Sequence, residues 1–124
     1  MQLYSNDGTQ SEIREIRFNE EEVMRYCQII GVEYKGYVPE LFCAKLWPEF
    51  TLFQEFINEK IYLKETKVYQ TNKLVTCTNY KAELRKKEVL KIKNFIKYTY
   101  TLKINKDNNN CIYIEQIFIK VNQI

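Results

Sequence analysis

The feature that most constrains the fold is an alternation of apolar and polar residues between Lys91 and Ile104. The even positions of this stretch are apolar and the odd positions are mostly Lys or Thr, with Asn94 and Phe95 as the two exceptions. A period of two is what a β-strand with one buried and one solvated face requires. The pattern therefore predicts a half-buried strand, with a ring on its polar face at Phe95.

Comparable runs on either side of this stretch extend it into an antiparallel meander. The further predicted strands cover Ile61–Tyr69, Lys73–Arg85 and Cys111–Val121, and the predicted turns lie at Thr71–Asn72, Lys86–Glu88 and Lys106–Asn110. The last strand changes phase, because Ile112 and Ile114 share one parity whereas Ile117 and Ile119 share the other. A bulge near Glu115 and Gln116, or burial of both faces at a dimer contact, would each explain that change.

The N-terminal half carries the helical signals. Residues 1–10 are polar and aperiodic, and we expect a disordered tail there, followed by a short strand within residues 12–18. Asn19 is a good N-cap and Glu22 completes a capping box, so a helix is predicted from Glu20 to Ile30, ended by Gly31.

A second, more apolar helix is predicted further on, with Pro48 in its first turn and Ile57 near its end. Because this segment is apolar on most sides, we expect the sheet to wrap around it. Helices followed by one antiparallel meander give an α+β fold.

Composition excludes several classes of protein. The chain has 124 residues, 45% of them hydrophobic, so it is long enough for one domain with its own core. No apolar run approaches a membrane span, and we expect a cytoplasmic protein without membrane contact. The four cysteines form no C-x-x-C pair and the chain has no His, so we predict reduced cysteines and no metal site.

The order of these segments resembles the MaoC-like dehydratase and hydratase family. The resemblance rests on the start Phe18-Asn19-Glu20, the turn at Gly31, the loop that ends in Val38-Pro39 and the strand that starts Ile61-Tyr62-Leu63. It implies a hot-dog fold over residues 11–124, in which a curved antiparallel sheet wraps a central helix. It also implies subunits that pair by joining their sheets, as a homodimer or with a catalytic hot-dog subunit, and a tunnel for an acyl thioester of coenzyme A or of an acyl-carrier protein.

The chain departs from that family at its catalytic pair. The hydratases carry an Asp and a His near the loop that corresponds to residues 31–37, whereas this loop reads Gly-Val-Glu-Tyr-Lys-Gly-Tyr. Glu33 is the candidate acid, but nothing replaces the imidazole near neutral pH. The resemblance therefore implies a degenerate member of this family that functions in fatty-acid metabolism. We expect it to bind an acyl thioester without hydrating it and without another cofactor. The predicted substrate-binding residues are Tyr34, Tyr37, Pro39, Phe42 and Trp47.

Three alternatives stay open. Hot-dog thioesterases use a lone carboxylate, for which Glu33, Glu40 and Glu49 are the candidates. A cystatin-like or NTF2-like binding domain would place the helix Glu20–Ile30, rather than the segment after Pro48, inside the curl of the sheet. Nucleic-acid binding by the stripe Lys91, Lys93, Lys97 and Lys103 is disfavoured, because only one ring, Phe95, lies among these lysines.

Overall fold

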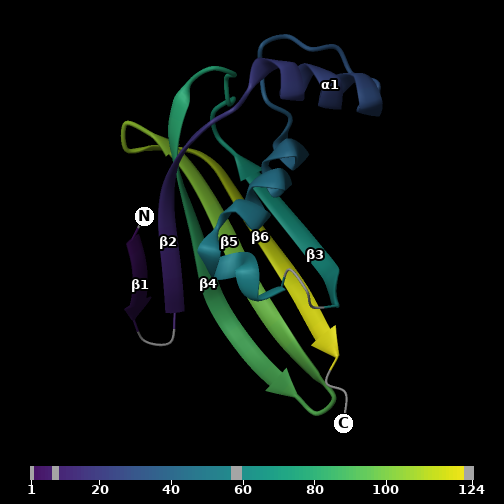
Figure 1. Cartoon of the computed structure of the whole chain (residues 1–124), viewed down its shortest axis with the longest axis vertical. Helices are drawn as coiled ribbons and strands as arrows, with labels where there is room; N and C mark the ends of the chain where they lie inside the picture. Colours follow the sequence, from purple (N-terminus) through teal and green to yellow (C-terminus); the bar gives the residue numbers. More distant parts are fainter. Residues whose placement is uncertain (1, 7–8, 57–59, 122–124) are drawn as a thin grey trace.

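The computed structural model describes residues 2–6, 9–56 and 60–121, and these residues form a six-stranded antiparallel sheet, an α-helix and two 3-10 helices. The strand order is β1-β2-β4-β5-β6-β3 (Figure 1). The elements are β1 (Gln2–Asn6), β2 (Thr9–Arg17), α1 (Glu20–Ile30), η1 (Glu40–Glu49), η2 (Thr51–Phe56), β3 (Ile61–Gln70), β4 (Asn79–Ile92), β5 (Phe95–Lys106) and β6 (Asn109–Val121).

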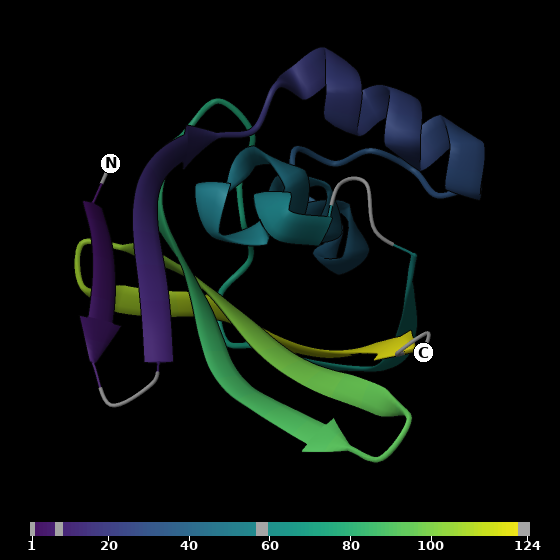
Figure 2. The same cartoon turned by 60° about the horizontal axis from the view of Figure 1, so that its bottom comes forward.

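The sheet is strongly curved, and η1 and η2 lie inside its curl (Figure 2). Helix α1 lies outside, across the open side of the curl (Figures 1 and 2). This arrangement is the one expected for a sheet that wraps the segment around Trp47. It contradicts the cystatin-like alternative, which needs α1 in the central place.

Helix α1 has the predicted bounds and caps, with one difference. The Asn19 side chain accepts a hydrogen bond from the Glu22 backbone N–H at 3.0 Å, and Gly31 ends the helix in the left-handed conformation at φ 77°. The Glu22 carboxylate does not complete a capping box; it forms an ion pair with Lys45 of η1, with 2.8 Å between Nζ and Oε2. A contact with a neighbouring element therefore replaces the local one.

The central segment is not the single helix predicted after Pro48. It consists of η1 and η2, with residue 48 near the end of η1, and the predicted Ile57 lies outside the described residues. The start of η2 is held by Glu12 of β2, whose side chain is fully buried. The two carboxylate oxygens of Glu12 accept hydrogen bonds from the backbone N–H groups of Thr51, at 3.1 Å, and Leu52, at 2.8 Å. A buried carboxylate thus satisfies amide donors that a helix start leaves without partners.

An aromatic cluster joins this central segment to the inner face of the sheet. Trp47 and Phe53 each contact Tyr100 of β5 and Phe118 of β6, with ring centroids 5.4–6.4 Å apart. The large rings supply much of the buried apolar surface, and their tilted and edge-on geometries are favourable. This cluster is the centre of the core.

Two of the sequence predictions for the chain's ends are corrected by the strands. The tail predicted for residues 1–10 is wrong in part, because Gln2–Asn6 form β1 and pair with β2, which begins at Thr9. The position of the bulge predicted near Glu115 and Gln116 is also wrong. Strand β6 keeps a regular register there against both neighbours. The register shifts lie instead at Cys111 of β6, opposite Ile104 and Asn105 of β5, and in β3 between Leu63 and Glu65.

The predicted four-strand meander is wrong in part, because only β4, β5 and β6 are neighbours in chain order, whereas β3 pairs with β6 at the edge of the sheet. The first hairpin of the meander also differs from the prediction. The turn predicted at Lys86–Glu88 is a bulge inside a long β4, and the chain turns at Lys93 and Asn94 instead. The break in alternation at Asn94 and Phe95 therefore marks the hairpin turn. It also divides the predicted lysine stripe, because Lys91 belongs to β4 whereas Lys97 and Lys103 belong to β5.

The second hairpin confirms its prediction. Asp107 and Asn108 form a two-residue turn with φ 49° and 67°. Positive φ at both central positions is the geometry that matches the twist of a tight hairpin, and Asp and Asn tolerate it.

Among the described residues no helix is long and apolar enough to cross a membrane.

Candidate functional site

The loop between α1 and η1 borders a pocket of about 270 Å³, which we call the loop pocket. Its walls come from the end of α1, the loop itself, the start of η1, the end of β3 and the segment that follows β3. The lining residues are Cys27, Val32, Glu33, Lys35, Tyr37, Val38, Pro39, Glu40, Gln70 and Lys73. Three residues of the predicted site, Glu33, Tyr37 and Pro39, are therefore brought together here.

The loop is fixed by the segment that precedes β4. Val38 donates its backbone N–H to the Leu74 carbonyl at 2.8 Å, and Thr76 donates to the Gly36 carbonyl at 3.2 Å. Tyr37 and Val75 form an isolated β-bridge between these two contacts. Gly36 has φ 88°, a conformation that other residues adopt at a cost, so this glycine is required by the turn. The pocket is thus built on backbone pairing rather than on a free loop.

The pocket combines an apolar wall with four charged side chains. Val38 and Cys27 are buried, whereas Val32 is 49% exposed at the mouth. Glu33 and Glu40 supply two carboxylates, and Lys35 and Lys73 supply two ammonium groups. The Lys73 ammonium lies 4.5 Å from the centroid of the Tyr37 ring, a cation–π distance. The arrangement can hold a small apolar group beside a polar, anionic one.

The remaining predicted site residues lie elsewhere. The Tyr34 hydroxyl shares a hydrogen bond of 2.7 Å with the Thr76 hydroxyl. Phe42 packs against Phe18 and Tyr26, and Trp47 belongs to the aromatic cluster of the core. Glu49 lies on a second, larger cleft along β2. These side chains line no wall of the loop pocket.

Two lysines and a glutamine of the loop pocket were missed from the sequence. Lys35 stands in the predicted loop between two predicted site tyrosines, so its position was a usable signal. Gln70 and Lys73 are more than thirty residues away along the chain and arrive through the bridge between Tyr37 and Val75. No local pattern indicates that pairing.

The cysteines occupy separate environments. Cys27, Cys43 and Cys111 are buried and Cys77 is exposed, and all four are free thiols. Burial, reinforced by the charge of Glu40, raises the pKa of the Cys43 thiol to about 12. Within the described part of the chain, no group of three or more His, Cys, Asp or Glu side chains is arranged to hold a metal ion.

Comparison with known families gives the relationship of the whole chain. Residues 1–122 match the family model described as "Uncharacterised conserved protein VraC". The chain belongs to the VraC family. It is 52% identical over 121 residues to Protein VraC of Staphylococcus epidermidis strain ATCC 12228, which covers 98% of this chain and 99% of the relative. It is 33% identical over 120 residues to Protein VraC of Staphylococcus aureus strain COL, and the match covers 97% of this chain and 98% of the relative.

Solved structures place this VraC-family chain in the hot-dog fold. The HadBC complex, a 3R-hydroxyacyl-ACP dehydratase of Mycobacterium tuberculosis, matches with a TM-score of 0.72 at 9% identity over 88% of this chain and 95% of that one. HtdX of the same organism matches with a TM-score of 0.79 at 13% identity over 92% of this chain and 49% of HtdX. The putative thioesterase yhdA of Lactococcus lactis matches with a TM-score of 0.65 at 10% identity over 99% of this chain and 91% of that one. The predicted α+β hot-dog fold is confirmed.

Proposed function

We propose that this chain binds an acyl thioester in the loop pocket, in the cytoplasm, without hydrating it. The ligand is the thioester of coenzyme A or of an acyl-carrier protein, and the chain acts as a non-catalytic relative or partner of a dehydratase. The observation that carries the proposal is the composition of the loop pocket on a hot-dog fold: an apolar wall with two lysines at its edge.

The chemistry of the pocket fits the two ends of such a ligand. A short acyl chain needs apolar wall, which Cys27, Val32 and Val38 provide. The phosphates of coenzyme A or of a carrier protein's phosphopantetheine need cations, which Lys35 and Lys73 provide. The dehydratase named in the HadBC structure and the putative thioesterase yhdA, which share this fold, support a thioester as the ligand class.

Hydration is disfavoured because the chain contains no His. A dehydratase of the resembled family needs an imidazole beside the acid to move a proton near neutral pH. Carboxylate-dependent hydrolysis is the second candidate, and one observation favours it: Glu33 and Glu40 border the same pocket. Either carboxylate would act as the base that activates water.

Pairing with a second hot-dog subunit is the proposed assembly, as a homodimer or a heterodimer. Strand β3 is an edge of the sheet, paired only with β6 among the described strands. It exposes Tyr62, Leu63 and Tyr69, which are 50%, 54% and 59% accessible. An edge with exposed apolar side chains favours strand addition. The loop pocket borders the end of β3 at Gln70, so a partner there would lie beside the ligand.

The direct test is calorimetric titration with butyryl-CoA, octanoyl-CoA and free coenzyme A. We expect saturable binding that is tighter for an acyl-CoA than for coenzyme A, because burial of the acyl chain adds to the phosphate contacts. Val32→Phe would narrow the pocket mouth and weaken acyl-CoA binding about tenfold, a loss of about 1.4 kcal/mol. The matched control is Val89→Phe, because Val89 of β4 is 47% exposed and lies outside the pocket.

The contribution of Lys35 and Lys73 is tested with two double variants that lose the same number of charges. Lys35→Ala with Lys73→Ala is expected to reduce affinity for both acyl-CoA and coenzyme A, whereas Lys81→Ala with Lys91→Ala removes the same charge elsewhere and leaves affinity unchanged. Equal losses in the two double variants would show that only the overall charge matters. Absence of binding for every thioester would reject the proposal.

Activity separates the candidate functions. We expect no hydration of crotonyl-CoA by the purified protein, and measurable hydration would refute the account of the missing imidazole. Hydrolysis of acyl-CoA that is lost in Glu33→Gln or Glu40→Gln, with binding retained, would establish the thioesterase alternative.

A further inference from the structure

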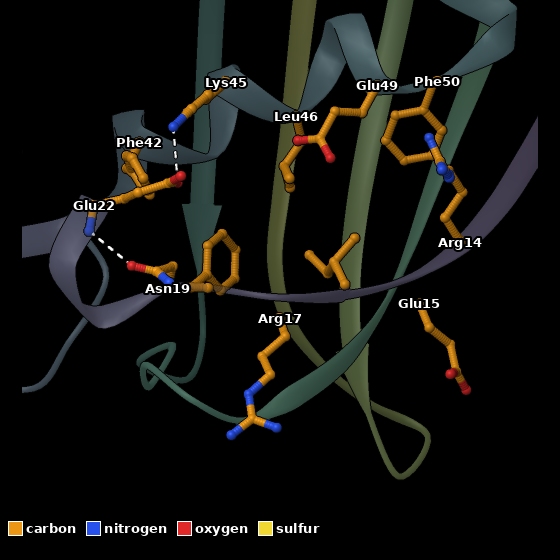
Figure 3. Close-up of a pocket in the computed structure, with 12 residues that line it drawn as sticks. Arg14, Glu15, Arg17, Asn19, Glu22, Phe42, Lys45, Leu46, Glu49 and Phe50 are labelled. Carbon is orange, nitrogen blue, oxygen red and sulfur yellow. Dashed lines mark hydrogen bonds and ion pairs between the residues drawn. The ribbon is translucent and has the colours of Figure 1, made fainter.

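A second and larger cleft, of about 700 Å³, opens between β2, the start of α1 and η1 (Figure 3). We call it the β2–η1 cleft. Its members were not among the residues expected to form a site, apart from Phe42 and Glu49. It shares no lining residue with the loop pocket. A ligand bound here would therefore be recognised by different side chains.

The floor of the β2–η1 cleft is apolar and largely aromatic. Phe18, Phe42, Leu46 and Phe50 are buried in the core and line the cleft, and the half-buried Ile16 lines it beside them. Apolar walls of this kind bind the apolar body of a small ligand, because contact with them removes that body from water.

The charged rim has one feature that points to an anion. Arg14 lies on the inner face of β2, on the same parity as the buried Glu12, and its side chain is half-buried. Figure 3 shows Arg14 reaching from β2 toward η1, whereas Arg17 points away from the cleft. The Arg14 backbone pairs with Ala82 of β4, but within the described part of the chain the Arg14 side chain takes part in no ion pair or hydrogen bond. A guanidinium directed into an apolar cleft without a partner is a site for a carboxylate.

The other charges of the cleft do not compete for this role. Lys45 and Glu22 neutralise each other in their ion pair of 2.8 Å. Glu15 follows Arg14 directly, but in Figure 3 its carboxylate is directed away from Arg14. Both oxygens of Glu12, the acid on the same face of β2 as Arg14, are engaged by the backbone of η2. Glu49 lines the cleft, but in Figure 3 its carboxylate is turned toward Leu46 and away from Arg14.

From these observations we propose that the β2–η1 cleft binds a free carboxylic acid with an apolar chain. The carboxylate pairs with the Arg14 guanidinium, and the chain lies on the floor formed by Ile16, Phe42 and Leu46. The ligand class is a medium-chain fatty acid anion. The proposal is independent of acyl-thioester binding in the loop pocket.

The experiment is a titration of the ¹⁵N-labelled protein with octanoate, followed by NMR, with 1-octanol as the uncharged matched ligand. We expect saturable shifts around Ile16 and Leu46 with a dissociation constant below about 1 mM. Arg14→Gln is expected to weaken octanoate binding about tenfold or more, since a charge-assisted hydrogen bond is lost, and to leave the weaker octanol binding unchanged.

Two further variants keep the result interpretable. Arg25→Gln removes the charge of an exposed arginine of α1 that lines neither pocket, and it should leave the affinity for octanoate unchanged. Arg14→Lys keeps the charge and should retain binding even if Arg14→Gln impairs folding. Failure of octanoate to saturate at about 10 mM, equal losses in Arg14→Gln and Arg25→Gln, or complete loss in a folded Arg14→Lys protein would each overturn the proposal.

The two sites are distinguished by testing each pocket's variant with the ligand proposed for the other pocket. Val32→Phe should leave octanoate binding intact, and Arg14→Gln should leave acyl-CoA binding intact. If Val32→Phe abolished octanoate binding, the carboxylate would belong to the loop pocket and the second site would be rejected.

Discussion

The central segment of η1 and η2 and the hairpin of β5 and β6 differ in what specifies them. The hairpin is set locally, because its strands alternate and its turn at Asp107 and Asn108 has the geometry that twisted antiparallel strands require. The central segment has little local support; η1 has no side-chain cap at Pro39. It is instead held by the carboxylate of Glu12 and by aromatic contacts with the sheet.

The difference shows that the same core has two kinds of determinant. Local periodicity and turn chemistry build the sheet, and long-range contacts then impose a conformation on the segment inside it. Substitutions in the hairpin should therefore change stability through the turn itself, whereas substitutions at distant partners such as Glu12 should change the stability of the central segment.

The largest expected contrast is in thiol reactivity. Burial raises the pKa of Cys43 in η1 from 9.0 to about 12, so at pH 8 its thiolate fraction is about a thousandfold below that of an ordinary thiol. We expect iodoacetamide to label the exposed Cys77 rapidly and Cys43 only after opening of the central segment, as followed by mass spectrometry. Rapid labelling of Cys43 in the folded protein would show that the centre is not packed as described.

The same pKa shift gives a pH dependence of stability. Because the thiol of Cys43 ionises near pH 9 when unfolded and near 12 when folded, it contributes stability below pH 9 that is lost as the pH rises from 9 toward 12. Cys43→Ala should flatten this alkaline decline in urea titrations.

The next largest effect is expected from Glu12→Leu. This change removes the acceptor from the buried N–H group of Leu52 and one acceptor from the partly buried N–H group of Thr51, at a cost of about 2–4 kcal/mol in the free energy of unfolding. The measurement is urea denaturation. Glu15→Leu is the control, because Glu15 is exposed on the same strand.

Labelling then shows where Glu12→Leu acts. Cys43 in η1 should be alkylated faster in this variant, whereas Cys111 in β6 should be affected only through global unfolding. Equal acceleration at both cysteines would remove the distinction between the two regions.

The smallest effect is expected at the hairpin turn. Asn108 has φ 67°, so Asn108→Gly should stabilise the protein by about 0.5 kcal/mol and Asn108→Ala should destabilise it by about 1 kcal/mol. Asn79→Gly should destabilise the protein, in contrast to Asn108→Gly, because Asn79 begins β4 and glycine costs stability in a strand. Thermal denaturation of the three variants distinguishes these outcomes.

The same distinction explains what the sequence could predict. The strands, the helix Glu20–Ile30 with its Asn19 cap, and the turn at Asp107 followed from residues close together in the chain. The turn at Lys93 was missed because Ile92 and Ile96, on either side of it, keep the same apolar parity and conceal the reversal. The form of the central segment depends on Glu12, and no local rule connects that residue with Thr51 about forty positions later.

The candidate site was predictable to a similar extent. Glu33, Tyr37 and Pro39 stand in one loop, and their proximity followed from the sequence. Lys73 and Gln70 reach the same pocket only because Tyr37 pairs with Val75. Arg14 was not predicted because the sequence indicated only a short strand within residues 12–18, and no periodicity shows that Glu12, Arg14 and Ile16 share the inner face of β2.

The bond from Glu12 to η2 also has a consequence for the order in which the molecule folds. Closing a loop of about forty residues costs chain entropy before any contact compensates it, whereas the two-residue hairpin closes at once. The centre should therefore acquire its structure after the rate-limiting barrier, so that Glu12→Leu accelerates unfolding and leaves the refolding rate nearly unchanged.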